Sequence, residues 1–432
     1  MDEKTAKAVL ATVLPRLKPS AEEREHDSKL AKQLIGEINK LGYEAVLVGS
    51  RGRDTFISGD RDLDIFMFFP KNTPREKLEK EGLSVGTRVL RRHHPTTHYA
   101  EHPYSKAVVE GVTVEIVPCY KLEKGEKIIS AVDRTPLHNE WVREHIRGKE
   151  DDVRLLKQFM KCRDIYGADQ RVNGFSGLLC ELLVIHYNGF LKVLEAASSW
   201  KQKTVIDIEK HGRDIKKFPE PLVVIDPVDP DRNAASAVSR TALSTFILHS
   251  RDFLKNPKQD AFFQKRQKVD LKRAITGRLL AGIVMPAPNV IGEILWSQLD
   301  RLRSQVKQHL IQNEFQVLRS SHWTDEKKCV LIFELAYAEL SQYRRHTGPE
   351  VWDAENVEKF IEKNPDHWWV EKSNIYSWKP RAYTNAIEAL RGMLKVTLQL
   401  PSHLQEPSKK AQLLVGTKLL HEKEALEAHV RK

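Results

Sequence analysis

The feature that most constrains the fold is one predicted strand that carries two carboxylates. Residues 62–69 are rich in aromatic and branched residues and are followed by Pro70, which predicts a strand that ends there. Side chains two positions apart on a strand point to the same face, so Asp62 and Asp64 should lie side by side. Because two unpaired carboxylates repel one another, this pattern favours a site for a hard divalent cation.

A glycine and a serine precede this strand, with eleven residues between Ser50 and Asp62. Residues 44–48 predict a short strand that runs into Gly49. A glycine at a strand end lets the backbone approach a phosphate, and the following N–H groups and hydroxyl can bind its oxygens. Arg51 and Arg53 follow and could neutralise phosphate charge. Each part alone is common in turns and exposed strands, but their order and spacing together favour nucleotidyl transfer.

A third carboxylate is available on another predicted strand. Residues 112–117 read as a strand ended by Pro118, and Glu115 stands between two apolar residues in it. A lone glutamate in an apolar run can also pair with a basic residue. With Asp62 and Asp64, however, Glu115 would complete a set that suits two metal ions, one at the attacking hydroxyl and one at the leaving phosphates.

The pattern along the chain changes after about residue 151. Residues 22–41 predict a helix in the first part, beside the three strands. Long helical patterns then follow over 153–166 and over 175–200, where Ser176 is a candidate N-cap, and helix resumes near Ala234 after a proline-rich stretch. A basic segment, 255–273, leads into a last third with a helix over 296–312 and short strands over 315–318 and 329–333.

At about 150 residues per domain, 432 residues suggest three domains. We therefore predict an α+β multidomain protein with domains at 1–145, 146–262 and 263–432, the second mostly helical and the third mixed α/β.

The net positive charge of the chain indicates an anionic binding partner. Seventy Lys and Arg against 59 Asp and Glu give a formal charge of +11, which favours polyanions such as nucleic acid or nucleotides. The four cysteines are scattered, without a Cys-x-x-Cys pair, and neither a secretory pattern nor a long apolar run is present. We expect a soluble cytoplasmic protein that does not associate with membranes.

The chain resembles a known family in several short stretches, which occur in the same order along the sequence. Gly49-Ser50 followed by Asp-x-Asp is the pattern of polymerase-β-like nucleotidyltransferases. More specifically, the chain is similar to the archaeal (class I) CCA-adding enzymes, which build the CCA end of tRNA from CTP and ATP without a nucleic-acid template. The supporting stretches are 48–50, 100–104, 117–121, 131–136, 154–157, 174–177 and 226–229; the C-terminal third matches loosely, at 318–320 and 348–349.

The resemblance implies a catalytic head domain, a nucleotide-selecting neck domain and a tRNA-binding body and tail, in that order. It implies that Asp62, Asp64 and Glu115 are catalytic and bind Mg²⁺ in a two-metal site, although the family has Asp where Glu115 stands. The implied nucleotide ligands are Gly49, Ser50, Arg53, His138, Lys157, Tyr166 and Arg232. The implied tRNA primer site contains His102, Arg134 and Thr135. Asn173 stands where the family has a basic residue.

Alternatives remain open at this stage. Lys157 and Lys161 could form a solvated helix face, Tyr166 could be a packed ring, Arg134 could pair with Asp133, and Arg232 could pair with Asp229 or Asp231. The partners implied are the acceptor arm and 3′ end of tRNA, with CTP and ATP as substrates; a homodimer is one assembly state to test. The competing functions are a poly(A) polymerase, an oligoadenylate synthetase-like enzyme, and an RNA-binding protein without catalytic activity.

Overall fold

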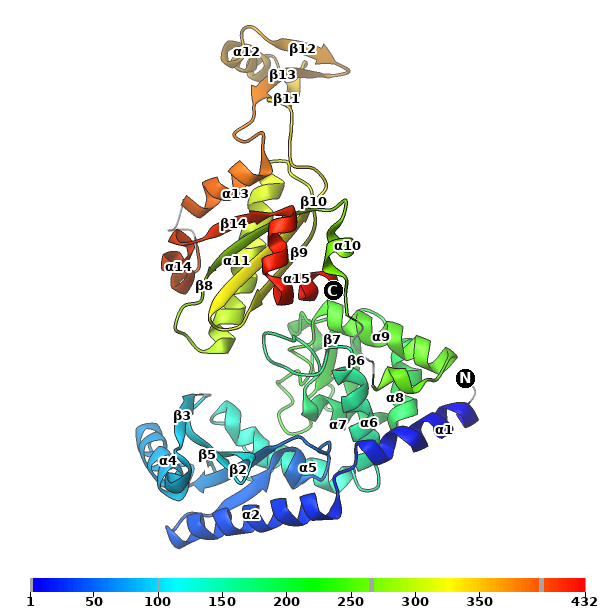
Figure 1. Ribbon diagram of the computed structural model, residues 1–432, viewed down its shortest axis with the longest axis vertical. Coiled ribbons are helices and arrows are strands. Elements are labelled where there is room, and N and C mark those ends of the chain that lie inside the picture. Colours follow the sequence, from blue (N-terminus) through cyan, green and yellow to red (C-terminus); the bar gives the residue numbers. More distant parts are fainter. Residues whose placement is uncertain (1–2, 100, 264–267, 396–399, 432) are drawn as a thin grey trace. The chain divides into compact units, whose positions relative to one another are not determined.

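The computed structural model describes residues 3–99, 101–263, 268–395 and 400–431 (Figure 1). It divides into two compact units, Met1–Lys265 and Arg266–Lys432. Ala100 of the stretch 100–104, and residues 264–267 of the basic segment, lie outside the described residues.

The first unit begins with an α+β part and continues with a mostly helical part. We keep the names head and neck for them. Helix α1 Glu3–Val13 comes first in the chain. The elements of the head are α2 Ala21–Lys40, β1 Ala45–Val48, α3 Gly49–Gly52, β2 Asp62–Phe69, α4 Arg75–Val89, β3 Thr96–Tyr99, β4 Pro103–Val109, β5 Val112–Tyr120 and α5 Arg134–His145. The elements of the neck are α6 Glu150–Lys161, α7 Gly177–Tyr187, α8 Phe190–Ser198, β6 Thr204–Asp207, β7 Leu222–Ile225 and α9 Arg240–Lys255.

The head contains a five-stranded sheet in the order β1-β2-β5-β4-β3. Strands β2 and β5 run parallel and the other neighbours are antiparallel. Helices α2 and α4 cover one face, where Leu34 and Leu78 pack against Leu63, Ile65 and other apolar side chains. Because side chains alternate along a strand, the even-numbered positions Asp62 and Asp64 lie on the opposite face.

The neck has a core built around aromatic rings. Phe159 on α6 has edge contacts with Phe190, Phe246, Phe253 and Phe262, which come from α8, α9 and the segment that follows it. Helix α1 joins this core through Ala6 and Val13, although it precedes the head in the chain. The first helix is therefore part of the neck's packing.

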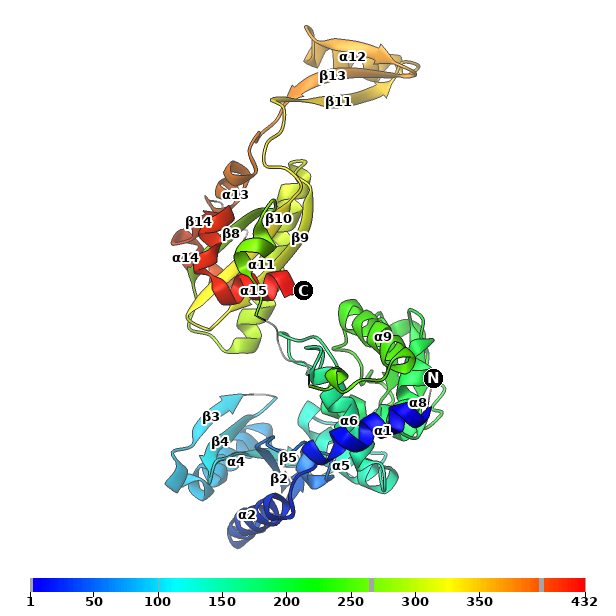
Figure 2. The same ribbon diagram turned by 45° about the vertical axis from the view of Figure 1, so that its right-hand side comes forward.

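The second unit contains an antiparallel sheet in the order β14-β8-β10-β9, and a small sheet in the order β11-β13-β12 that contacts α12 (Figure 2). Residues of α11 and α13 pack in one core of the larger sheet, and residues of α10 and α15 in another. The elements are α10 Leu271–Ile275, β8 Leu279–Pro286, α11 Gly292–Gln312, β9 Val317–Thr324, β10 Lys328–Leu335, β11 Tyr343–Glu350, α12 Ala354–Lys363, β12 Trp368–Glu371, β13 Asn374–Pro380, α13 Ala386–Lys395, α14 Gln405–Lys409, β14 Gln412–Val415 and α15 Lys423–Arg431.

Two predicted elements differ in the structure for visible reasons. Strand β5 continues through Pro118 to Tyr120, because the ladder between β4 and β5 ends at Ser105 opposite Ile116 and leaves Pro118 with a strand neighbour on its β2 side. The predicted helix 175–200 is two helices that meet at 89°. Asn188 (φ 63°) and Gly189 (φ 127°) end α7 in the left-handed region. Ser176 caps α7 as predicted.

Two further boundaries also shift. The predicted helix over 153–166 ends at Lys161, and Tyr166 instead forms a bridge with Phe175. The helix expected near Ala234 begins at Arg240, with Ser239 as its cap. Among the described residues no single helix is long and apolar enough to cross a membrane; the bent pair α7 and α8 passes such a test by length and composition alone.

Candidate active site

The register of the head sheet brings the predicted carboxylates together. Asp64 on β2 lies opposite Glu115 on β5 and opposite Val48 on β1. Burial, together with the charges of Glu115 and Asp62, raises the pKa of Asp64 to about 6. A carboxylate whose pKa is raised by neighbouring carboxylates lies where added positive charge is stabilising.

The third carboxylate is already ion-paired. Lys106 on β4 lies across from Glu115, and its Nζ is 2.8 Å from Glu115 Oε1. Within the described part of the chain, no group of three or more His, Cys, Asp or Glu is close enough to hold a metal ion. The neighbouring Asp62 and Asp64 nonetheless fit a divalent cation, because they offer oxygen ligands whose mutual repulsion it would relieve.

Gly49 lies against Asp64 and has no room for a side chain. It begins the short helix α3, and its φ of +71° is in the left-handed region. A Cβ placed on Gly49 would lie 2.3 Å from Asp64 Oδ2, so a side chain cannot fit there without moving the carboxylate. Ser50 follows in α3, and its carbonyl accepts a hydrogen bond from the N–H of Thr55 at 2.8 Å.

The two arginines after Ser50 point inward. Arg51 donates from Nε to the carbonyl of Asp62 at 2.8 Å and forms an ion pair with Asp27. Arg51 therefore holds the first residue of β2 through its backbone carbonyl. Arg53 Nε donates to Glu181 Oε1 at 3.1 Å, and its Nη2 lies 2.9 Å from Glu181 Oε2.

Lys157 joins the same buried cluster from α6. Its Nζ donates to the carbonyl of Thr55 at 3.0 Å and to the Thr55 hydroxyl at 3.3 Å, and lies 4.0 Å from Glu181 Oε1. Lys157 is 1% exposed, so the solvated-face alternative is wrong for this residue. Burial lowers the pKa of Lys157. Lys161, one turn later, forms an ion pair with Asp60 at 2.7 Å.

Tyr166 lies beside Lys157 at the start of α7. A Cβ placed on Gly177 would lie 3.2 Å from the Tyr166 hydroxyl and 3.8 Å from Lys157 Nζ. Burial raises the pKa of Tyr166. The hydroxyl and the ammonium therefore both lie near Gly177 at the amino end of a helix, where backbone N–H groups favour anions.

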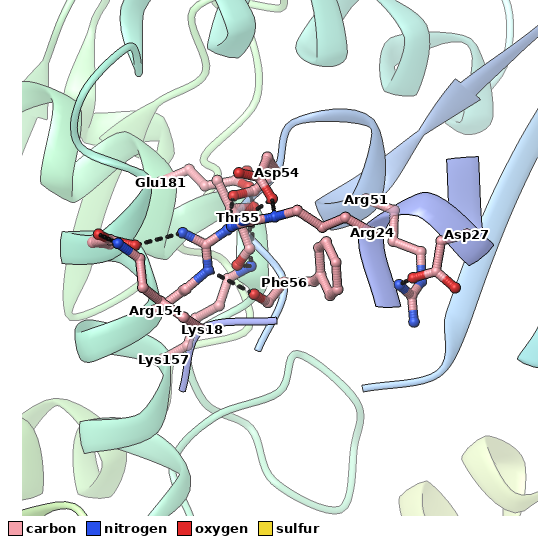
Figure 3. Close-up of polar contacts among 11 residues, drawn as sticks. Lys18, Arg24, Asp27, Arg51, Asp54, Thr55, Phe56, Arg154, Lys157 and Glu181 are labelled. Atoms are coloured by element: carbon pink, nitrogen blue, oxygen red, sulfur yellow. Dashed lines mark hydrogen bonds and ion pairs between the residues drawn. The ribbon is translucent and has the colours of Figure 1, made fainter. Parts of the chain in front are cut away.

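Arg154 fixes the loop that carries Thr55, as Figure 3 shows. Its Nε donates to the carbonyl of Phe56 at 2.9 Å, and its guanidinium also contacts Asp54 and Asp151. In the sequence, Arg154 belongs only to the stretch 154–157 that supports the family resemblance, and it has no predicted role. The available signal was the spacing of Arg154, Lys157 and Lys161 by three and four residues, which places them on one face of the helix, but spacing alone does not show that such a face is buried.

One buried aspartate of the neck holds two predicted nucleotide ligands. His138 Nε2, on α5, lies 2.8 and 2.9 Å from the carboxylate oxygens of Asp226, and Arg232 Nη1 lies 2.6 Å from Asp226 Oδ2. Burial alone would raise the pKa of Asp226, but His138 and Arg232 outweigh it and hold that pKa at about 2. Arg232 pairs with Asp226, not with Asp229 or Asp231 as the sequence alternatives suggested.

The residues predicted for the tRNA primer site are spread more widely than the predicted nucleotide ligands. Arg134, at the start of α5, pairs with Asp229 at 2.8 Å and not with Asp133, and Thr135 follows it, partly buried. His102 is 1% exposed, and its Nδ1 lies 3.2 Å from Glu79 Oε1. Among the described residues its Nε2 has no hydrogen-bond partner. None of the contacts described for His102 joins it to the carboxylates or to the cluster around Glu181.

Three family models match successive parts of the chain. A nucleotidyltransferase domain matches residues 29–138, the second domain of tRNA nucleotidyltransferase matches 151–263, and the C-terminal domain of CCA-adding enzyme matches 276–416. A solved structure described as a cytoplasmic RNA terminal U-transferase aligns with 61% of this chain and 100% of its own, at 13% identity and a TM-score of 0.48.

Curated relatives match nearly the whole chain. A CCA-adding enzyme of Methanoregula boonei is 41% identical over 408 residues, which covers 90% of this chain and 87% of the relative. One from Methanocaldococcus jannaschii is 36% identical over 415 residues, covering 91% and 92%. These matches confirm the predicted family and the nucleotidyltransferase fold class. The chain therefore belongs to the family of the CCA-adding enzymes, the nucleotidyltransferases that complete the 3′ end of tRNA.

Proposed function

We propose that this chain adds and repairs the terminal CCA of tRNA with Asp62 and Asp64 as its metal-binding, catalytic residues. In this reaction the 3′-hydroxyl of tRNA attacks the α-phosphate of CTP or ATP, and pyrophosphate leaves. The observation that carries the proposal is the sheet register, which sets Asp64 between Glu115 and the β1 end that leads into Gly49.

Divalent ions of the Mg²⁺ type would be held by Asp62 and Asp64, with Glu115 as third ligand once it leaves Lys106. Bound there, they would offset the charge of the reacting phosphates and favour the ionised attacking hydroxyl. Gly49 leaves room for the Asp64 carboxylate because it has no Cβ, and Ser50 follows it at the end of β1.

The nucleotide would lie between the head and the neck. Arg53, Lys157 and Tyr166 would bind the triphosphate, because they gather near the amino end of α7. His138 and Arg232 would line the base end, and Arg134, Thr135 and His102 would approach the primer. The division into domains 1–145, 146–262 and 263–432 remains the proposal made from the sequence, with the difference that helix α1 packs in the core of the neck.

The second unit would bind the acceptor arm of tRNA. A groove beside α12 is lined by Lys359, Lys363 and Lys379 together with His346 and Trp378. Lysine side chains can bind the phosphates of the RNA backbone, and exposed aromatic rings such as Trp378 can stack on nucleotides. Recognition would therefore depend on shape and phosphate contacts more than on base sequence.

The test is nucleotide addition to tRNA that lacks its 3′ end, with CTP, ATP or both, and with or without Mg²⁺. Two C residues should be added with CTP alone, and one A only afterwards. Asp64→Asn should nearly abolish addition while tRNA binding persists, whereas the exposed control Glu110→Gln should behave as wild type. Substantial activity of Asp64→Asn would refute the site, and acceptance of ATP alone with long products would indicate a poly(A) polymerase. The same protein, run by size-exclusion chromatography with light scattering, tells a monomer from a homodimer.

A further inference from the structure

Two buried cations of the first unit share one carboxylate. Arg53 comes from the head and Lys157 from the neck, and among the described residues Glu181 is the carboxylate within 4.0 Å of either. All three side chains are nearly or fully buried. Thr55 connects them, because its hydroxyl donates to Glu181 and accepts a hydrogen bond from Lys157 (Figure 3).

The cluster is short of negative charge. One carboxylate faces a guanidinium and an ammonium, so one positive charge has no ionic partner within the cluster. An uncompensated charge is costly away from water and is stabilised by a bound counter-ion. Burial lowers the pKa of Lys157, the Arg53 charge lowers it further, and the charge of Glu181 offsets this only in part.

We propose that Glu181 is a positioning residue for the triphosphate. Glu181 fixes the Arg53 guanidinium through both carboxylate oxygens and fixes Lys157 through the Thr55 hydroxyl. Its single negative charge balances only one of the two cations, and the triphosphate supplies the negative charge for the other. This inference rests on the proposed function, because it takes Arg53 and Lys157 to be triphosphate ligands.

Glu181→Gln separates positioning from simple structural support. Glutamine keeps the volume of the side chain but removes its charge, so both cations lack a counter-ion in the free enzyme. Inorganic tripolyphosphate should then bind this variant about tenfold more tightly than it binds wild type, because the polyanion now compensates two charges in place of one. The value of kcat for addition of one C should fall about tenfold, because the guanidinium is no longer held in one orientation.

The experiment measures the midpoint of thermal unfolding against tripolyphosphate concentration, without metal, and kcat and KM for CTP with Mg²⁺. The variants are Glu181→Gln, Arg53→Gln and, as a matched control, Glu195→Gln, which removes a partly exposed glutamate on the adjacent helix α8. Arg53→Gln should lose most of the protection by tripolyphosphate, and Glu195→Gln should match wild type in every measurement.

The outcomes distinguish a wrong triphosphate assignment for Arg53 and Lys157 from a wrong role for Glu181. If tripolyphosphate protects neither wild type nor any variant, the assignment of Arg53 and Lys157 to the triphosphate is wrong. If it protects wild type but protects Glu181→Gln no better, or if that variant keeps its kcat, the role of Glu181 is refuted.

If Glu181→Gln does not fold, Thr55→Val decides. This change removes the connecting hydroxyl and leaves every charge in place, so kcat should fall while protection by tripolyphosphate stays close to that of wild type. A wild-type kcat for Thr55→Val would overturn the inference.

Discussion

Replacing Gly49 with alanine tests whether the position of one carboxylate controls catalysis. The φ of +71° is unfavourable for any residue with a Cβ, and costs about 1 kcal/mol. The added Cβ would lie 2.3 Å from Asp64 Oδ2 and 3.3 Å from its Cγ. The carboxylate must therefore withdraw by about 1 Å to reach an ordinary van der Waals distance.

The expected effects on stability and on rate are unequal. The free energy of unfolding should fall by about 1–2 kcal/mol, since the clash adds to the backbone strain. The value of kcat should fall about 100-fold, because a displacement of about 1 Å at reacting groups costs this much in rate. Denaturant unfolding gives the first quantity. Addition of one C to tRNA lacking its 3′ end, at saturating CTP and Mg²⁺, gives the second.

Gly42→Ala is the matched control. Gly42 has a φ of +89°, and a Cβ there would meet nothing within 4 Å. This variant should lose similar stability through backbone strain and retain wild-type kcat. If Gly49→Ala were as active as Gly42→Ala, the contact with Asp64 would have no catalytic meaning and the reasoning would fail.

Three further outcomes are expected. Glu115→Ala should slow addition of one nucleotide at least tenfold, since it removes a carboxylate and leaves the Lys106 ammonium near Asp64; unchanged addition would exclude a metal role. The affinity for tRNA, measured by filter binding, should fall steadily as salt rises, and a salt-independent affinity would contradict phosphate contacts. The second unit should lose stability as the pH falls from 6.5 to 4. Burial and the charges of Arg319 and Arg278, only partly offset by Glu334, lower the pKa of His429 to about 4, so the unfolded chain binds the proton first. With screening by water, a loss of about 1–2 kcal/mol should appear as faster hydrogen exchange in β9 and β10, and His429→Gln should reduce this dependence.

The local parts of the site could be predicted because they depend on short-range patterns. Strand β2 has the predicted bounds, since its side-chain alternation and Pro70 define it within nine residues. The start of α7 at Ser176 was also readable, because an N-cap is a property of adjacent residues. The break at Asn188 and Gly189 had a signal too, since Asn-Gly is a strong turn dipeptide inside an apolar helical run.

The partners of the buried charges could not be predicted. Arg53 and Glu181 are 128 positions apart, and no spacing rule relates them. Glu181 does carry a sequence signal, since it is a single charge in the apolar stretch 178–184 and a charge there must be paired. That signal identifies a buried carboxylate but does not identify the cation. Similarly, the family resemblance pointed to His138 and Arg232, but only the fold shows that Asp226 holds both.

The contacts that join the head to the neck are formed by the same side chains that we assign to the nucleotide. Arg53 and His138 from the head are held by Glu181 and Asp226 of the neck, and Lys157 from the neck is held by the Thr55 carbonyl of the head. A triphosphate that adds its charge to these pairs therefore acts on side chains that also join the two parts. Nucleotide binding and the contact between head and neck would then depend on the same side chains. For a template-independent enzyme this coupling is useful, because a nucleotide that leaves any of these cations unsatisfied also leaves the two parts imperfectly joined.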